Sequence, residues 1–548
     1  MGSLRLDTAH VAGVDRTARR DIPLPMKWTR RRFLKVAGVA VATGACGTAP
    51  SGGGDAVNSD ALADSNDALD ANTGLDARTD SSATDAAFDT ATDASSVLDA
   101  RADGGRCGPT DSGSTPDARP DLGFSSIPLS ANFPQGVMAG DALPRRAMVW
   151  TRYGGTRALV VRVVETLRDG TVIAAAFEGS VTTTTPFDFV HFDVMGLRPS
   201  AFYKYAFIER DAAGNNVGRS RVGRFRTAID PTDACTVLTF GGVSCNSGRQ
   251  AELMGGAVPA LAQAAGDDLD FFIHAGDHIY ADFTNATTLA DYRDVYSRYW
   301  RFDGLSDVHA STALYTTWDD HEVYNNWNIE NVERSGRQAQ LDVARQAFFE
   351  FRAFRRSATD PDRIWRSFTW GDVVELFILD VRAERRPSID QMISRAQMDW
   401  LKRGISTSTA VFKLIVTSKP ITGRVPLADE SQRADFWEAF RPQREELLGH
   451  IVNNDIPGVV FLSGDIHTGM LSRVEATGPY RNLREVCMGP ACSGDQDGTI
   501  SCGGTGQNEI VIHRYNYTRF RADPIARTFR VEFIGEGGGV ICSQTIRV

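Results

Sequence analysis

Four short apolar segments of the chain each run into residues that can bind metals or move protons. They are residues 237–240, leading to Ser244-Cys245; 269–274, leading to Asp277, His278 and Tyr280; 314–318, leading to Asp319-Asp320-His321-Glu322; and 459–462, leading to Asp465 and His467. One Gly-Asp after a strand is commonly only a turn. Four such ends, all rich in Asp, His, Cys or Tyr, indicate one shared site.

Carboxylates gathered in one place need a counter-charge, because burying an unpaired carboxylate is very costly. Metal ions supply that charge. Two or more cations can also hold a phosphoryl group, neutralise the charge that develops on it and make hydroxide from bound water. These side chains therefore favour a metal-dependent reaction at phosphorus.

The elements that must position these residues change character near residue 231. From 232 onward, short apolar runs separated by helical stretches are typical of an α/β layered domain, in which the ends of successive strands meet at one crevice. Before that point, short alternating runs predict a β-sandwich, and Leu197-Arg-Pro199 ahead of Tyr203 resembles the tyrosine corner of fibronectin type III-like domains. We expect an all-β fibronectin type III/Ig-like domain over 124–230 and a catalytic domain over 231–548.

The order and spacing of the four motifs resemble those of the calcineurin-like metallophosphoesterases. Two of the motifs differ from the pattern of that family, and in both the residues resemble those of alkaline phosphatase D. Cys245 stands where the parent family has a carboxylate, and Trp318-Asp-Asp-His-Glu-Val323 stands where G-N-H-E is usual. Residues 133–152 resemble the opening of the same family. The resemblance covers roughly 124–470, leaves out the Cys- and Gly-rich stretch after Pro479, and implies a four-layer αββα sandwich for the catalytic domain.

The resemblance also implies a centre of ferric iron and calcium. The implied metal ligands are Cys245, Asp277, Tyr280, Asp320, Asp465 and His467. The thiolate, the phenolate and the imidazole would bind iron, and Asp277 would bridge the two metals. The two later aspartates would bind calcium, which prefers oxygen ligands.

Three further residues carry implied catalytic roles. His321 would stabilise the transition state or protonate the leaving alkoxide. Arg382 and Arg385 would bind the phosphate oxygens in a forked geometry. His274 is interpreted as a core histidine, and His278 is left unassigned because the family more often has Tyr there. Cys245 has a plainer alternative as a buried core thiol or one half of a disulfide.

The function that follows is hydrolysis of phosphate monoesters or diesters by attack of a metal-bound hydroxide. One alternative is a phosphodiesterase specific for phospholipid or cell-wall polymer. Another is a non-catalytic surface protein that binds phosphoesters. A phosphate ester is the expected partner, and no broad basic face for nucleic acid is evident.

The N-terminal region is predicted to contain an export signal followed by a flexible linker. Residues 29–35 followed by 36–45 match a twin-arginine export signal, which implies the twin-arginine machinery as a partner and a location in the periplasm, at the outer surface or in the medium. Cys46 resembles a lipoprotein cleavage site, and Met26 is the expected start. Residues 51–123 hold fifteen Asp, no Glu, four Arg and no Lys, which accounts for the whole net charge of -10. We expect 47–123 to be a disordered acidic linker.

The chain has eight cysteines. Setting aside Cys46 and Cys245 leaves six, an even number suited to disulfides outside the cytoplasm. The four late cysteines, at 487, 492, 502 and 542, could instead form a metal knot. Pairing cannot be predicted from spacing alone.

Overall fold

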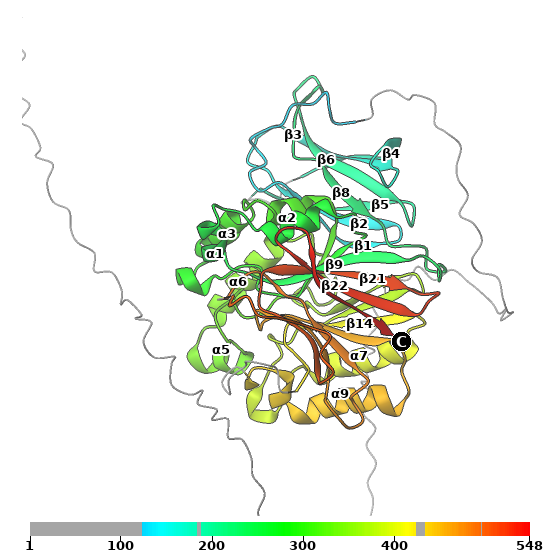
Figure 1. The fold of residues 1–548 in the computed structure, drawn as a ribbon. Helices are drawn as coiled ribbons and strands as arrows, with labels where there is room; N and C mark the ends of the chain where they lie inside the picture. The colour runs from blue at the N-terminus through cyan, green and yellow to red at the C-terminus, as the bar shows by residue number, and fades with distance from the viewer. Residues whose placement is uncertain (1–122, 183–187, 424–432, 495) are drawn as a thin grey trace, which may run out of the picture. The chain divides into compact units, whose positions relative to one another are not determined.

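A computed structural model describes residues 123–182, 188–423, 433–494 and 496–548 of the chain (Figure 1). The predicted export signal, the Cys46 lipidation site, the Met26 start and the linker lie outside these residues. No helix within the described part is long and apolar enough to cross a membrane.

Two large sheets form the middle of the molecule. The first has the order β23 (Val540–Arg547), β22 (Thr528–Gly535), β21 (Asn516–Asp523), β9 (Leu238–Asn246), β10 (Phe272–His274), β11 (Ala313–Thr316), β1 (Val137–Leu143), β2 (Arg146–Arg152), β5 (Phe189–Met195), with β18 (Pro490–Cys492) paired to β9. The second has the order β12 (Arg366–Trp370), β13 (Val374–Ile378), β14 (Phe412–Val416), β15 (Val459–Ser463), β17 (Arg484–Cys487), β16 (Gly469–Arg473), β20 (Asn508–Ile512), β19 (Ile500–Cys502).

Helices cover the outer face of each sheet. The first sheet carries α1 (Gly248–Leu253), α2 (Pro259–Gly266), α3 (Leu289–Tyr299), α4 (Leu305–Ser311), α5 (Ile329–Ser335) and α6 (Gln338–Glu350). The second carries α7 (Arg395–Thr407) and α9 (Arg441–Asn453). The layers are therefore helix, sheet, sheet and helix, as expected for the catalytic domain.

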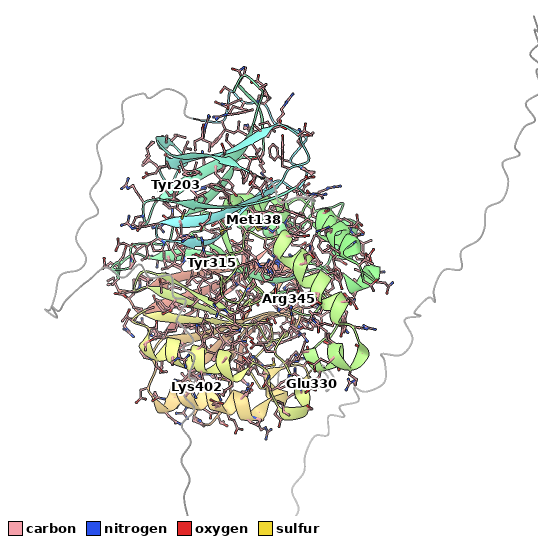
Figure 2. All side chains as sticks on the ribbon, turned by 180° about the vertical axis from the view of Figure 1, so that it is seen from behind. Met138, Tyr203, Tyr315, Glu330, Arg345 and Lys402 are labelled. Carbon is pink, nitrogen blue, oxygen red and sulfur yellow. A yellow bond between two sulfur atoms is a disulfide. The ribbon has the colours of Figure 1, made fainter. Side chains whose placement is uncertain are left out.

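The two-residue period of the strands distributes side chains between these layers. In β10, Ile273 points into the central core between the sheets, whereas Phe272 packs beneath the helices. In β14, Leu414 joins the central core and Ile415 packs against α7 and α9. Strands buried on both faces read as continuous apolar runs, which explains why the sequence shows them clearly. Tyr315, in the central core, and Met138, on the helix side, are marked in Figure 2.

The N-terminal region differs from the sandwich expected over 124–230. The separate sheet there consists of β4 (Val172–Val181), β3 (Ala158–Thr166), β6 (Phe202–Arg210) and β7 (Asn216–Arg219), with β8 (Gly223–Arg226) paired to β6. The remaining strands, β1, β2 and β5, extend the catalytic sheet instead. A self-contained fibronectin type III-like domain is therefore not confirmed.

The junction depends on the parallel pairing of β1 with β11, in which Ala139 lies opposite Ala313. Gly140 makes this approach feasible, because a Cβ there would lie 2.3 Å from the backbone oxygen of Ala353.

The tyrosine corner forms within the smaller sheet: the backbone N–H of Arg198 donates to the Tyr203 hydroxyl at 2.8 Å.

The cysteines follow the expectation only in part. Cys502 of β19 and Cys542 of β23 form a disulfide, and Cys235 is also disulfide-bonded. Cys487 and Cys492 are buried free thiols, so neither six paired cysteines nor a knot of the four late cysteines is present. The Cys502–Cys542 bond connects the outermost strand of one large sheet to the outermost strand of the other.

Breaking this bond should weaken the contact between the sheets. Replacing Cys502 and Cys542 with Ser is expected to lower the free energy of unfolding by about 2–4 kcal/mol, since the bond closes a loop of 40 residues. Thermal melts of the variant and the wild type measure the difference. The single variant Cys542→Ser should match the double variant, and a double variant as stable as the wild type would show that the bond contributes nothing.

Candidate metal centre

The four predicted strand ends meet at one place. Cys245 ends β9, Asp277 follows β10, Asp320 follows β11, and Asp465 and His467 follow β15. Three groups of possible metal-binding residues form there, and within each group the ligand atoms lie within 4.8 Å of one another: Cys245, Asp277 and His467; Asp277, Asp320 and His321; and Asp277, Asp319, Asp320 and Asp465. Asp277 is the one residue that all three groups share.

The backbone at this site adopts an uncommon conformation. Cys245, Asp277, Asp465 and His467 have φ values of 59°, 56°, 71° and 50°, in the left-handed region that favours glycine. Such conformations cost about 1–3 kcal/mol each for ordinary residues and cluster at functional sites. The fold therefore holds these four side chains in place at an energetic cost, as expected for a binding site.

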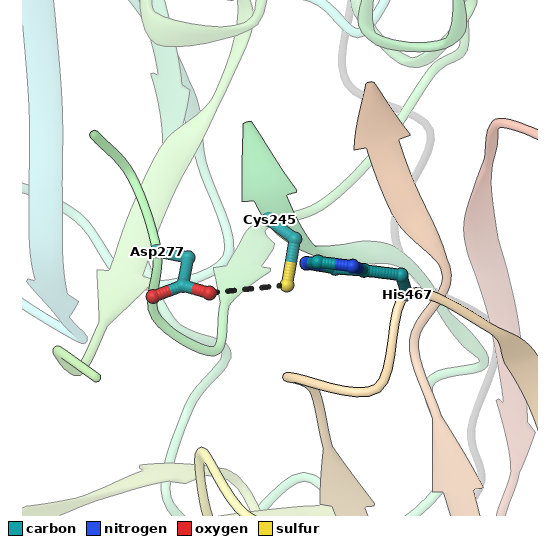
Figure 3. A group of neighbouring side chains, drawn as sticks. All are labelled: Cys245, Asp277 and His467. Carbon is teal, nitrogen blue, oxygen red and sulfur yellow. Dashed lines mark hydrogen bonds between the residues drawn. The ribbon is translucent and has the colours of Figure 1, made fainter. Parts of the chain in front are cut away.

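One side of the site combines sulfur, phenol and imidazole donors around Asp277. The Cys245 thiol donates to Asp277 Oδ2 at 3.4 Å (Figure 3), and the Tyr280 hydroxyl donates to the same oxygen at 3.3 Å. Tyr280 Oη also lies 3.0 Å from His467 Nε2. Ser493, which the sequence did not single out, lies 2.8 Å from the Tyr280 oxygen and 3.1 Å from His467 Nε2.

The electrostatics of these donors fit a cation between them. Burial, together with the nearby Asp277 carboxylate, raises the pKa of both the Cys245 thiol and the Tyr280 hydroxyl well above the ordinary range. Burial and the neighbouring Asp320 and Asp319 carboxylates likewise raise the pKa of Asp277. A bound metal ion reverses this balance, because it stabilises the deprotonated forms of all three groups. A thiolate, a phenolate and an imidazole can together bind a metal ion.

The other side of the site is built from carboxylates. Asp277, Asp319, Asp320 and Asp465 form the group of oxygen donors. Asp319 Oδ2 and Asp320 Oδ1 are buried, and they lie 3.1 Å from cationic nitrogens of Lys419 and Arg382 respectively. A cluster of buried carboxylates of this kind can supply oxygen ligands to a cation. Asp319, which the sequence left unassigned, is a member of this set together with the predicted Asp320 and Asp465.

His321 stands beside the donors, near the solvent. Its Nδ1 lies 2.8 Å from Asp282 Oδ1, and its ring stacks on Tyr280 with the centroids 4.1 Å apart. The His321 and Asp282 side chains are 12% and 19% exposed, whereas Cys245 and Asp277 are fully buried. Burial lowers the pKa of His321, but the Asp320 and Asp277 carboxylates outweigh burial and raise it to about 10.

Asp282 orients His321 and should matter for that reason alone. Replacing Asp282 with Asn keeps the size of the side chain but removes the charge, and we expect kcat to fall roughly 10–100-fold while the metal content stays unchanged. Steady-state kinetics and elemental analysis measure both quantities. Asp294→Asn, at an exposed position of α3, is the control and should match the wild type; an unchanged kcat in Asp282→Asn would contradict this role.

The two predicted arginines lie against acidic residues of the centre. Arg382 is fully buried and contacts the carboxylates of Asp319 at 2.7 Å, Asp320 at 3.1 Å and Asp435 at 2.7 Å. Arg385 is buried as well and forms an ion pair with Asp435. Both guanidinium groups pair with protein carboxylates, and binding of substrate phosphate by these arginines stays a prediction.

Glu322 connects two loops of the centre by hydrogen bonds. This fully buried carboxylate accepts hydrogen bonds from the backbone N–H groups of Asp277, His278 and Asp319. It therefore links the loop after β10 to the loop after β11. His274 and His278 lie behind these loops, fully buried and stacked at 3.5 Å, in agreement with a core histidine at 274.

Comparison with known proteins gives one consistent result. The sequence profile described as PhoD-like phosphatase matches residues 240–517, and the profile of the N-terminal domain of PhoD-like phosphatases matches 122–229. Alkaline phosphatase D of Bacillus subtilis (strain 168) is 27% identical over 404 residues, which span 64% of this chain and 66%, just under two thirds, of that protein.

Two solved structures share the fold. A structure of PhoD is 22% identical, with a TM-score of 0.63 and coverage of 76% of this chain and 89% of its own. Purple acid phosphatase PPD1 from yellow lupin (Lupinus luteus) seeds is 16% identical, with a TM-score of 0.54 and coverage of 75% and 73%. Both support the arrangement of layers that brings the four strand ends together.

Proposed function

The chain belongs to the PhoD-like phosphatase family, and from that premise we propose that it is an exported, metal-dependent hydrolase of phosphate monoesters or diesters. One observation carries the proposal. The buried Asp277 carboxylate is shared by a sulfur–phenol–imidazole donor set on one side and an oxygen donor set on the other. A single residue in that position suits a bridge between two different cations.

The chemical type of the donor atoms divides the residues into ligands of two different metals. Cys245, Tyr280 and His467 would hold ferric iron, and Asp320, Asp465 and the added Asp319 would hold calcium, with Asp277 between them. When bound, the metals supply charge for a phosphoryl group and acidify the attacking water.

His321 is placed for proton transfer to the leaving group. Its Nδ1 is engaged by Asp282, so Nε2 is the atom that holds the transferable proton. The Asp282 carboxylate at Nδ1 favours the protonated form of His321. Phe283 lies beside it, 57% exposed and with its ring centroid 5.6 Å from that of His321, and offers an apolar surface for an organic leaving group.

Action outside the cytoplasm is supported by two observations. Residues 29–45 carry the pattern of a twin-arginine signal, followed by Cys46 as a candidate lipid-anchor site. The Cys502–Cys542 disulfide is typical of proteins that mature in an oxidising compartment.

The test is release of nitrophenol from 4-nitrophenyl phosphate and bis(4-nitrophenyl) phosphate by the full chain produced with its own export signal. We expect turnover that a calcium chelator abolishes and added calcium restores, and the preferred ester distinguishes a monoesterase from a diesterase. Tight binding of both esters without any release of nitrophenol, by protein that contains both metals, would instead establish a binding protein.

A further inference from the structure

Lys419 lies inside the carboxylate side of the centre. It follows β14, and the Lys-Pro bond to Pro420 favours an extended backbone at Lys419. Its side chain is 1% exposed. The ammonium lies 3.1 Å from Asp319, 3.7 Å from Asp320 and 2.8 Å from Asp435, and it forms a close ion pair with Asp465.

These contacts use the same groups that would bind calcium. Asp319, Asp320 and Asp465 belong to the oxygen donor group, and all three lie around one Lys419 nitrogen. An ammonium is a compact charge with three N–H donors, so it can stand among several carboxylates much as a metal ion does. Asp435, which also pairs with Arg382, contacts the same nitrogen.

The local charge supports the same conclusion. Five buried or nearly buried carboxylates converge here: Asp277, Asp319, Asp320, Asp435 and Asp465. Among the described residues, Arg382, Arg385 and Lys419 form ion pairs with members of this set, and His321 lies beside Asp277 and Asp320. Removing Lys419 would leave the carboxylates with one more uncompensated negative charge, which favours binding of a further divalent ion.

We propose that Lys419 is a built-in cation of the metal centre: its ammonium fills a position among Asp319, Asp320 and Asp465 that a further calcium ion would otherwise take. Lys419 is thus a positioning residue that sets how many divalent ions the carboxylates hold. This inference rests on the proposed function for the presence of calcium, but its readout is calcium binding and not turnover.

The first test compares Lys419→Gln, which removes the charge, with Lys419→Arg, which keeps it. Lys402→Gln is the matched control, because Lys402 of α7 pairs with Glu446 away from the centre (Figure 2). Each full-length protein is stripped with chelator and titrated with calcium by calorimetry. We expect Lys419→Gln to bind one more calcium ion per chain than the wild type, and Lys419→Arg and Lys402→Gln to bind the same number as the wild type. Equal numbers in wild type and Lys419→Gln overturn the proposal.

A second test needs no variant and covers the case in which Lys419→Gln does not fold. In a crystal structure of the calcium-loaded wild type, Lys419 Nζ should remain within 4 Å of Asp319 and Asp465, the contact range of the present ion pairs. A calcium ion in that position, with Lys419 displaced, overturns the proposal. Protein that passes both tests but hydrolyses no ester would contradict the proposed function and leave the role of Lys419 standing.

Discussion

Asp277→Asn is expected to lower kcat/KM by at least about 10³-fold, which corresponds to about 4 kcal/mol of transition-state stabilisation. Asp277 is fully buried and is shared by all three groups of candidate ligands. The uncharged Asn side chain should therefore weaken the binding of both metals. The loss should therefore appear in metal content as well as in turnover. Elemental analysis of the purified variant and steady-state kinetics with an aryl phosphate measure the two effects together.

Asp399→Asn serves as the control for this prediction. Asp399 lies on α7, is 44% exposed and pairs only with Arg395 among the described contacts, so its variant should match the wild type in both measurements. Unchanged metal content in Asp277→Asn, with turnover within tenfold of the wild type, would remove Asp277 from the centre.

His321→Asn is expected to lower kcat by roughly 10²–10⁴-fold, the usual contribution of a positioned general acid. The metal content should be preserved, because His321 lies nearer the solvent and Cys245, Tyr280 and His467 remain in place. The decrease in kcat should also depend on the leaving group of the ester. An ester with a good leaving group, such as nitrophenol, needs little protonation and should lose less activity than an alkyl ester.

The dependence on leaving group separates catalysis from structure. If His321 only supported the fold or bound a metal, both esters would lose activity equally and metal content would fall. His309→Asn, at a buried histidine of α4 packed on Trp300, tests whether loss of any buried histidine gives the same result. It should change stability without changing the ratio of the two activities.

Much of the site was predictable because each ligand follows an apolar strand in the sequence. Cys245 lies at the end of β9, Asp277 and Asp320 follow within four residues of β10 and β11, and Asp465 and His467 follow β15. Parallel strands place their carboxyl ends at one edge of a sheet, so order along the chain becomes proximity in space. The strands themselves are buried on both faces and read as short apolar runs.

The partners of these residues were less visible in the sequence. Lys419 stands 46 residues before Asp465 in the chain, and a lysine after a strand usually indicates only solvent exposure. Asp282 could have been found, since it lies two residues after Tyr280 and a histidine beside a metal commonly pairs with a carboxylate. The ion pairs of Arg382 and Arg385 with acidic residues were not predictable, because sequence does not show which charges neutralise each other.

The N-terminal region shows a different limit. Strands β1, β2 and β5 are short strands of the kind that sandwiches contain, but β1 pairs with β11, more than 170 residues later. Such non-local pairing depends on close backbone approaches at positions like Gly140. The hydrophobic periodicity of a single segment does not predict them. The cysteines show the same limit, since the spacing suits several pairings and only the fold selects Cys502 with Cys542.

The most direct test of the account is the metal content and visible absorption of the purified full-length protein, compared with Tyr280→Phe and Cys245→Ser. If the centre holds iron and calcium as proposed, the wild type contains both metals and shows an absorption band from the phenolate of Tyr280 bound to ferric iron. That band is lost in Tyr280→Phe, and iron is lost in Cys245→Ser. An active wild-type protein without iron, or iron content and absorption that neither variant alters, would contradict the account.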